Sequence, residues 1–163
     1  VHIAFLDLLL ERAIKENIHV TLETSGFFRY NSLESILQKI PLIYFDLKTM
    51  DDGIHRRFTG QSNTIILENA RRLQQSSINV EFRLPIVQTV NDDQRSVNEF
   101  IDFLRGIGEY RVHLLRYHTM YLSKLDWLGV TDDRSIFPVQ GDDEFAQVVR
   151  AFEEAGIVVV NRA

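Results

Sequence analysis

Four successive apolar stretches of this sequence end in charged side chains, and these side chains are the candidates for ligand binding or catalysis. They are Glu23, the pair Asp46 and Lys48, Arg83, and Arg116 with His118. Burying several charges is unfavourable unless they meet one another or a charged ligand. Lys48 and Arg83 could bind a carboxylate. Glu23 and Asp46 could bind a cationic or hydroxyl group, so the set as a whole fits a zwitterionic ligand such as an amino-acid derivative.

The stretch at residues 42–48, LIYFDLK, shows most clearly why these charges need an explanation. Its apolar and aromatic start is typical of a strand that is buried on both faces, as in parallel sheets under helices. Side chains two apart on a strand share a face, so Asp46 and Lys48 point the same way at the carboxyl end of the strand. In parallel β/α folds, ligands bind at that end.

Each of these residues also has a purely structural interpretation. Glu23 could face solvent, Asp46 and Lys48 could form a simple ion pair, Arg83 could pair with Glu81, and His118 could cap a loop. Taken together they favour a ligand site, because parallel neighbouring strands would bring them to one rim of the sheet.

Apolar periodicity predicts the elements that must position these residues. We expect strands at 18–23, 42–48, 79–87, 111–117 and 157–160, and helices at 5–15, 33–38, 52–58, about 64–73, about 91–106 and about 142–156. Strands that alternate with helices imply an α/β fold with a parallel sheet and right-handed crossovers. A closed eight-stranded barrel needs about 250 residues. The 163 residues therefore predict one domain, 1–163, that is either an open doubly wound sheet or part of a barrel.

Several local details follow from residue type. Asn31 or Ser32 should cap the helix at 33–38, and Asp51 and Asp52 suit the start of the next helix. Residues 119–141 are irregular, and in this segment we expect Trp127 and Phe137 to cover the barrel.

Composition excludes several classes of function. The net charge of -5 and the lack of a basic face argue against nucleic-acid binding. The apolar runs are much shorter than the roughly 20 residues of a membrane span, and no signal peptide is recognisable, so a cytoplasmic setting is expected. The sequence has no Cys, which excludes disulfides and thiolate metal sites within it. Its five His lack metal-ligand spacing.

Several short motifs follow one another along nearly the whole chain. They are TLETSGF at 21–27, YFDLKTMD at 44–51, His55 with GQSN at 60–63 and LEN at 67–69, FRLPIV at 82–87 with Asn91-Asp92, LRYH at 115–118, and Lys124 with WLG at 127–129. This ordered set resembles the radical S-adenosylmethionine (SAM) enzymes that activate glycyl-radical enzymes. The chain differs from the family pattern in three places: Glu23 stands where Asp is common, Gln88-Thr89-Val90 replaces P-G, and Arg116 replaces the Pro of L-P-Y-H.

The resemblance implies a partial (β/α)6 barrel with a radical SAM, TIM-barrel-like core. It also implies a 4Fe-4S cluster held by three cysteines of a C-x3-C-x2-C motif, and a G-G-E-P strand end, both of which precede the first matching residue. Together with the missing initiator Met, this leads us to expect a C-terminal fragment that lacks the first two strands and the cluster ligands. The edge of the strand at 20–23 would then lie open, and self-association or covering by the N-terminal helix is expected.

The resemblance also implies roles for individual residues. Lys48 would hold the methionine carboxylate of SAM, and Arg83 would line the rim. Asp46 and Glu23 would lie near the ligand, where the resemblance allows a monovalent cation. Thr24 and Ser25 would contribute backbone or hydroxyl contacts, and His118 would meet the ribose or adenine. No catalytic residue is expected among these 163 residues.

For the whole enzyme, the resemblance implies that SAM and the cluster produce a 5'-deoxyadenosyl radical. That radical would remove a hydrogen from a backbone glycine of a partner such as pyruvate formate-lyase, with electrons from a reductant such as flavodoxin or ferredoxin. The fragment itself is expected to be inactive and to hold no cofactor tightly.

Two alternatives stay open on the sequence. One is another β/α-barrel enzyme, a lyase in which Lys48 forms a Schiff base beside Asp46. The other is a barrel scaffold or binding module without catalysis.

Overall fold

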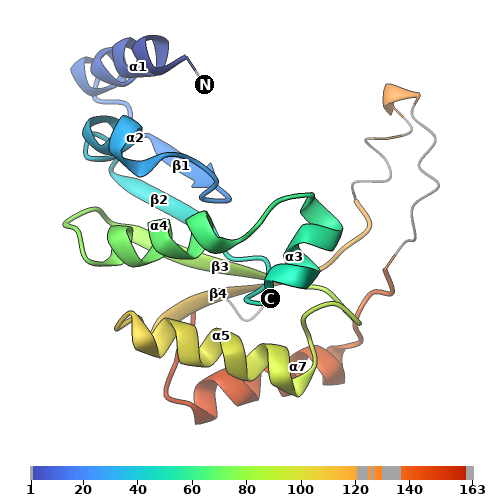
Figure 1. Ribbon diagram of the computed structural model, residues 1–163. Coiled ribbons are helices and arrows are strands. Elements are labelled where there is room, and N and C mark those ends of the chain that lie inside the picture. Colours follow the sequence, from blue (N-terminus) through green and yellow to red (C-terminus); the bar gives the residue numbers. More distant parts are fainter. Residues whose placement is uncertain (1, 121–124, 126, 130–136, 161–163) are drawn as a thin grey trace.

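The computed structural model of the chain describes residues 2–120, 125, 127–129 and 137–160 (Figure 1). Lys124 of the family resemblance lies outside these residues. The elements, in chain order, are α1 Ile3–Lys15, β1 Thr21–Thr24, α2 Tyr30–Leu37, β2 Leu42–Asp46, α3 Asp52–Thr59, α4 Thr64–Gln74, β3 Val80–Ile86, α5 Gln94–Gly106, β4 Arg111–Arg116, α7 Asp142–Glu154 and β5 Val158–Val159. The alternation of strands and helices predicted from the sequence is confirmed. No helix in the described part of the chain has both the length and the apolar character of a membrane span.

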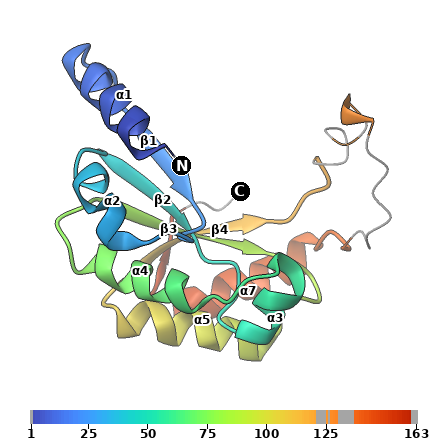
Figure 2. The same ribbon diagram turned by 45° about the horizontal axis from the view of Figure 1, so that its top comes forward.

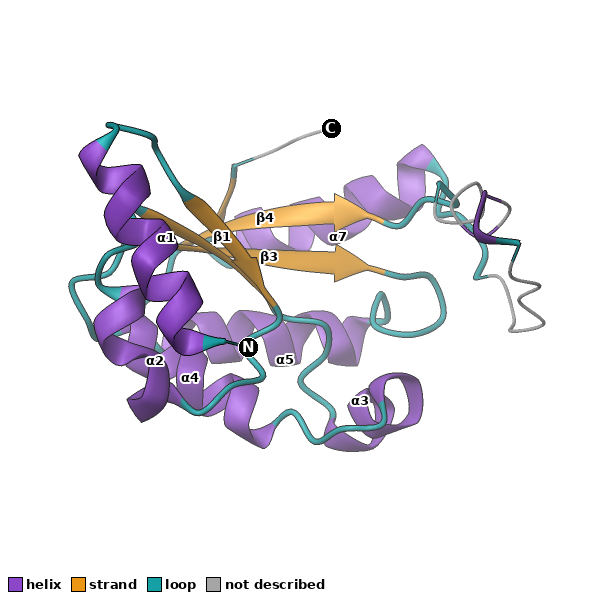
Figure 3. Cartoon of the chain, turned by 90° about the horizontal axis from the view of Figure 1, so that it is seen from above, coloured by secondary structure: helices purple, strands orange, loops and turns teal. Residues whose placement is uncertain are grey.

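The strands form one parallel sheet in the order β1-β2-β3-β4-β5. Each strand lies beside the next one in the chain, so every right-handed crossover places its helix on the same face of the sheet. Helices α4 and α5 lie together on that face, below the strands in the views of Figure 2 and Figure 3. A doubly wound sheet would reverse its order and carry helices on both faces. The fold is therefore an α/β fold of the partial-barrel kind.

The core lies between this face of the sheet and the helices. Strand β2 sends Ile43 and Phe45 into it, and β3 sends Phe82, Leu84 and Ile86; all five are at most 1% exposed. The intervening side chains of β2 are only half-buried, in the burial pattern iBiBi. The prediction that residues 42–48 are buried on both faces was therefore wrong, because only one face of β2 is covered by helices.

Some element boundaries differ from the sequence predictions. Strand β1 begins at Thr21. Helix α2 begins at Tyr30 with Arg29 at its N-cap position, so neither Asn31 nor Ser32 caps it. Asp51 does cap α3, where its carboxylate accepts a hydrogen bond from the backbone N–H of Ile54 at 2.8 Å.

The two aromatic residues expected to cover the barrel behave differently. Trp127 is 85% exposed and covers nothing in the described structure, so that prediction was wrong for it. Phe137 packs edge-on against Phe58 of α3, with 5.4 Å between the ring centroids, and against Tyr117, with 6.0 Å.

Gly26 gives a direct test of the packing between the loop after β1 and the core. Its φ is +76°, and a Cβ at this position would collide with the ring of Phe45. Gly60 has nearly the same φ, +75°, but a Cβ there would meet nothing within 4 Å. We expect Gly26→Ala to lower the free energy of unfolding by about 2–4 kcal/mol, because left-handed strain and overpacking add. Gly60→Ala should lower it by only about 1 kcal/mol, from the strain alone.

Urea denaturation of the two variants measures the difference. Equal losses of stability would show that the contact between Gly26 and Phe45 does not constrain the fold.

Candidate functional site

Four charged side chains meet at the carboxyl ends of β1 and β2. Arg83 reaches this place from the middle of β3, so the expectation that its strand ends at Arg83 was wrong. We call Glu23, Asp46, Lys48 and Arg83 the rim cluster. The guanidinium of Arg83 donates two hydrogen bonds to the Glu23 carboxylate, at 2.9 and 3.1 Å. Its Nε donates to Asp46 Oδ1 at 2.9 Å. The Lys48 ammonium lies 3.6 Å from Asp46 Oδ2, which makes a longer ion pair.

The register of the strands explains how these residues meet. Asp46 and Arg83 are directly paired positions of β2 and β3. Glu23 is paired with Tyr44, which lies two residues before Asp46 on the same face. The long Arg83 side chain therefore crosses β2 to reach the carboxylate on β1. On the way its guanidinium lies over the Tyr44 ring, 5.0 Å from the centroid, in a cation–π contact.

Burial divides the rim cluster into an inner and an outer part. The side chains of Arg83 and Asp46 are 16% and 20% exposed, whereas those of Lys48 and Glu23 are 41% and 65% exposed. Two carboxylates and two cations leave the cluster neutral overall. The inner pair is shielded from water and is geometrically fixed, and the outer groups are accessible to a ligand.

The protonation equilibria follow from this arrangement. The hydrogen bond and the charge of Arg83 lower the pKa of Glu23 below its ordinary value of 4.5. Partial burial opposes the charged form of Arg83, but its hydrogen bonds to Glu23 and Asp46 outweigh this and raise its pKa above the ordinary value. Glu23 and Arg83 are therefore both fully ionised near neutral pH.

Of the purely structural interpretations of single residues, one is confirmed and one is wrong. Asp46 and Lys48 do form an ion pair, as that interpretation expected, but within the larger cluster. Arg83 does not pair with Glu81, whose carboxylate instead lies 2.6 Å from Nε2 of His113. The monovalent cation near Glu23 and Asp46 stays a prediction, and in the structure the Arg83 guanidinium supplies the positive charge between the two carboxylates.

The loop after β1 contains two further predicted site residues. Thr24 is half-buried, and its hydroxyl oxygen accepts a hydrogen bond from the backbone N–H of Gly26 at 3.1 Å. Ser25 is exposed beside it. Their predicted contacts with a ligand are compatible with this position next to Glu23 at the strand end.

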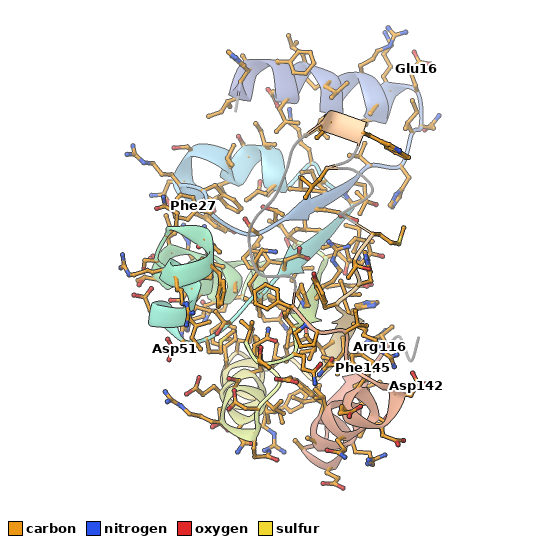
Figure 4. The ribbon with its side chains drawn as sticks, turned by 90° about the vertical axis from the view of Figure 1, so that its right-hand side faces the viewer. Glu16, Phe27, Asp51, Arg116, Asp142 and Phe145 are labelled. Atoms are coloured by element: carbon orange, nitrogen blue, oxygen red, sulfur yellow. The ribbon has the colours of Figure 1, made fainter. Side chains whose placement is uncertain are left out.

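The fourth strand end does not join the rim cluster. Arg116 follows Val112 and Leu114 on the helix-covered side of β4, where its guanidinium bonds Asp142 of α7 at 2.7 Å and lies over the Phe145 ring at 4.8 Å. Figure 4 shows these three side chains together. The expectation that all four strand ends converge was therefore wrong for Arg116, because β4 ends there with this side chain on the opposite face. His118 is exposed beyond the strand, where its Nδ1 accepts from the backbone N–H of Met120 at 3.4 Å.

Three buried asparagines around the site belong to the motifs at 60–63, 67–69 and 91–92, but no role in the site was predicted for them. Asn63, Asn69 and Asn91 are 3%, 2% and 1% exposed, and each carboxamide bonds backbone carbonyls of the loops that follow β1, β2 or β3. A signal was present for Asn69, which is spaced with Ile66, Ala70 and Leu73 on the apolar face of its helix. A polar residue on such a face needs buried partners.

A pocket of about 250 Å³ lies away from the rim cluster, where β3 and β4 begin. Its charged lining includes Glu109, Arg111, and the pair of Glu81 and His113.

Comparison with known proteins places the chain in a family. Residues 2–104 match the family model described as the Radical SAM superfamily. The chain is 29% identical over 140 residues to the trans-4-hydroxy-L-proline dehydratase activating enzyme of Clostridioides difficile, a match that covers 85% of this chain and 46% of the relative. It is 34% identical over 122 residues to the pyruvate formate-lyase 1-activating enzyme of Escherichia coli K12, covering 73% and 49%. The chain thus spans about half the length of these curated relatives.

A solved structure has the same fold. The crystal structure of a domain of pyruvate-formate lyase-activating enzyme from Bacteroides vulgatus superimposes with a TM-score of 0.80 at 22% identity, covering 98% of this chain and 90% of that one. The partial-barrel arrangement of strands is therefore one that occurs in solved proteins.

The pKa of Glu23 gives a test of the rim cluster. Because the folded pKa is below 4.5, the ion pair with Arg83 stabilises the fold above about pH 4.5 and is lost as the pH falls through the folded value. We expect a carbon-13 NMR titration of the Glu23 carboxyl to show this lowered pKa. Arg83→Met should return it towards the ordinary value.

Arg95→Met is the matched control, since it removes an exposed ion pair with Glu99 on α5. An unchanged Glu23 titration in Arg83→Met would contradict the hydrogen-bonded cluster.

Proposed function

The chain belongs to the radical SAM superfamily, and from this premise we propose that it is the SAM-binding part of an enzyme that generates a glycyl radical on a partner enzyme. The observation that carries the proposal is the rim cluster at the carboxyl ends of β1 and β2, since β/α folds bind ligands at this end of the sheet. The homologous curated proteins are activating enzymes, which supports the activity class.

Binding and orientation are the tasks proposed for these residues. Lys48 is exposed, and its ion pair with Asp46 among the described residues is long, so its ammonium can turn to the methionine carboxylate of SAM. Asp46 is fixed by Arg83 and lies on the same face, and Glu23 presents an accessible carboxylate beside them. A neutral cluster with separate positive and negative ends suits the zwitterionic end of SAM. Arg83 is proposed to line the rim.

Other contacts with SAM come from loops. Thr24 and Ser25 are proposed to contribute backbone or hydroxyl contacts at the end of β1. His118 is proposed to meet the ribose or adenine, for which its exposed ring is sterically accessible.

The 4Fe-4S cluster that supplies the reducing electron in this superfamily does not fit the residues present. The sequence contains no Cys, so none of its side chains can provide the thiolate ligands. We therefore propose that these 163 residues bind and position SAM without cleaving it. The partner is proposed as a glycyl-radical enzyme such as pyruvate formate-lyase, and the reductant as a flavodoxin or ferredoxin.

The variant Lys48→Ala tests the binding role. Loss of a charge-assisted contact with a carboxylate should weaken SAM binding by about tenfold or more. The measurement is the dissociation constant of SAM, by isothermal titration calorimetry, for the chain and the variant. Lys39→Ala is the matched control. Lys39 is also ion-paired, but its partners are Asp7 and Glu11 of α1, outside the rim cluster.

Equal affinity in Lys48→Ala, or no SAM binding by the chain itself, would contradict the binding role. The coding sequence upstream of Val1 checks the activity class, since the proposal requires codons for a C-x3-C-x2-C motif there. Borohydride trapping with a carbonyl substrate distinguishes the Schiff-base lyase, which requires an adduct on Lys48.

We also propose that the chain associates with a second copy of itself through β1. In the described chain β1 pairs only with β2, and its sequence TLET has neither Lys nor Pro to protect the open edge. At the same edge of the molecule α1 exposes Phe5 (67%), Leu8 (68%) and Leu9 (51%) (Figure 1). A two-fold related copy would pair the two β1 edges antiparallel and cover these side chains.

Sedimentation equilibrium should show dimers of the chain that Leu8→Lys dissociates. Leu128→Lys, at an apolar side chain that is 73% exposed elsewhere, should leave the dimer intact. A chain that stays monomeric at every concentration measured would overturn this proposal.

A further inference from the structure

The carboxamide of Asn91 connects two strand-end loops. Its Nδ2 donates to the carbonyl of Lys48, after β2, at 2.7 Å and to the carbonyl of Pro85, in β3, at 2.8 Å. Its Oδ1 accepts from the backbone N–H of Val87 at 2.7 Å. Both donor hydrogens and the acceptor of this buried side chain are therefore used.

The other two buried asparagines each hold a single loop. Asn69 donates to the carbonyls of Gly26 and Phe28, both at 2.8 Å. Asn63 donates to the carbonyls of Thr49 and Met50, at 3.1 and 2.8 Å. Of the three, Asn91 is the one that fixes the Lys48 backbone against a neighbouring strand.

The β2–β3 ladder ends just before Lys48. Its last backbone bond runs from the N–H of Leu47 to the carbonyl of Arg83 at 2.9 Å. Pro85 has no N–H to continue the ladder, and the carbonyls of Lys48 and Pro85 both accept from the Asn91 amide instead. The side chain thus continues the ladder by one step, at the residue that bears the rim ammonium.

The turn that carries Asn91 is held in a strained conformation. Thr89 has a φ of +68°, which is an unfavourable backbone conformation for a β-branched residue. The backbone N–H of Thr89 donates to Asp92 Oδ1 at 2.8 Å, and Gln140 Nε2 donates to Asp92 Oδ2 at 3.0 Å. Bonds from Asn91 and Asp92 therefore keep the turn from relaxing.

We propose that Asn91 is a positioning residue, which fixes the Lys48 backbone against β3 and so directs the Lys48 ammonium towards the ligand carboxylate. This inference rests on the proposed binding of SAM by Lys48. No other amino-acid side chain of this size offers two donors and an acceptor in one plane, so Asp, Ser or Ala at this position cannot make all three bonds.

The test compares Asn91→Ala with Asn63→Ala, which removes two equally buried amide-to-carbonyl bonds beyond Lys48. Hydrogen exchange measured by mass spectrometry reports the loops directly. We expect Asn91→Ala to speed exchange about tenfold in both segments 47–50 and 86–90, and to weaken SAM binding about tenfold. Asn63→Ala should affect only the first segment and change the dissociation constant less than about twofold.

A double variant separates positioning from folding. Thr89→Gly removes the strain of the turn, so Asn91→Ala with Thr89→Gly should regain much of the lost stability while SAM binding stays weak. Recovery of binding together with stability would overturn the inference, as would equal loss of binding in Asn63→Ala. If the wild-type chain does not bind SAM, the proposed function fails, and the exchange rates alone then decide whether Asn91 fixes the Lys48 backbone.

Discussion

The structure around the site depends on how the charge of Arg83 is satisfied. Its side chain is 16% exposed, so the guanidinium has lost most of its contact with water and needs carboxylates in fixed positions. Asp46 supplies one from the neighbouring strand and Glu23 supplies another from the strand beyond it. One side chain from the middle of β3 thus connects three strands, and it fixes the positions of the two carboxylates next to Lys48.

The loops beyond these strands are fixed by a second kind of interaction. Backbone carbonyls that leave the sheet lose their ladder partners, and burial without a partner is unfavourable. Carboxamides from Asn63, Asn69 and Asn91 supply these partners. A primary amide offers two donors, so one side chain can hold two carbonyls. The rim is therefore held by ion pairs within the sheet and by hydrogen bonds from asparagine carboxamides in the loops beyond the strands.

Much of the fold was predictable from local patterns. The alternation of strand and helix periods predicted the element order, and the charged strand ends predicted that Glu23, Asp46 and Arg83 would meet. The periodicity did not separate a doubly wound sheet from part of a barrel, because both consist of the same units. The prediction for Arg116 was wrong because β4 ends with that side chain on the helix side of the sheet, where it bonds Asp142.

Local patterns in the sequence show which side chains carry charge, on which strands they lie, and, through the motifs, which family the chain resembles. These properties are local, since a period of two along a strand assigns each side chain to a face without knowledge of its neighbours. The pairing of Arg83 with Glu23 and Asp46 instead of Glu81, and the bonds by which Asn91 joins Lys48 to β3, become visible in the packed fold alone. Such pairings depend on strand order, register and side-chain reach, and these arise only when segments distant in the sequence pack together.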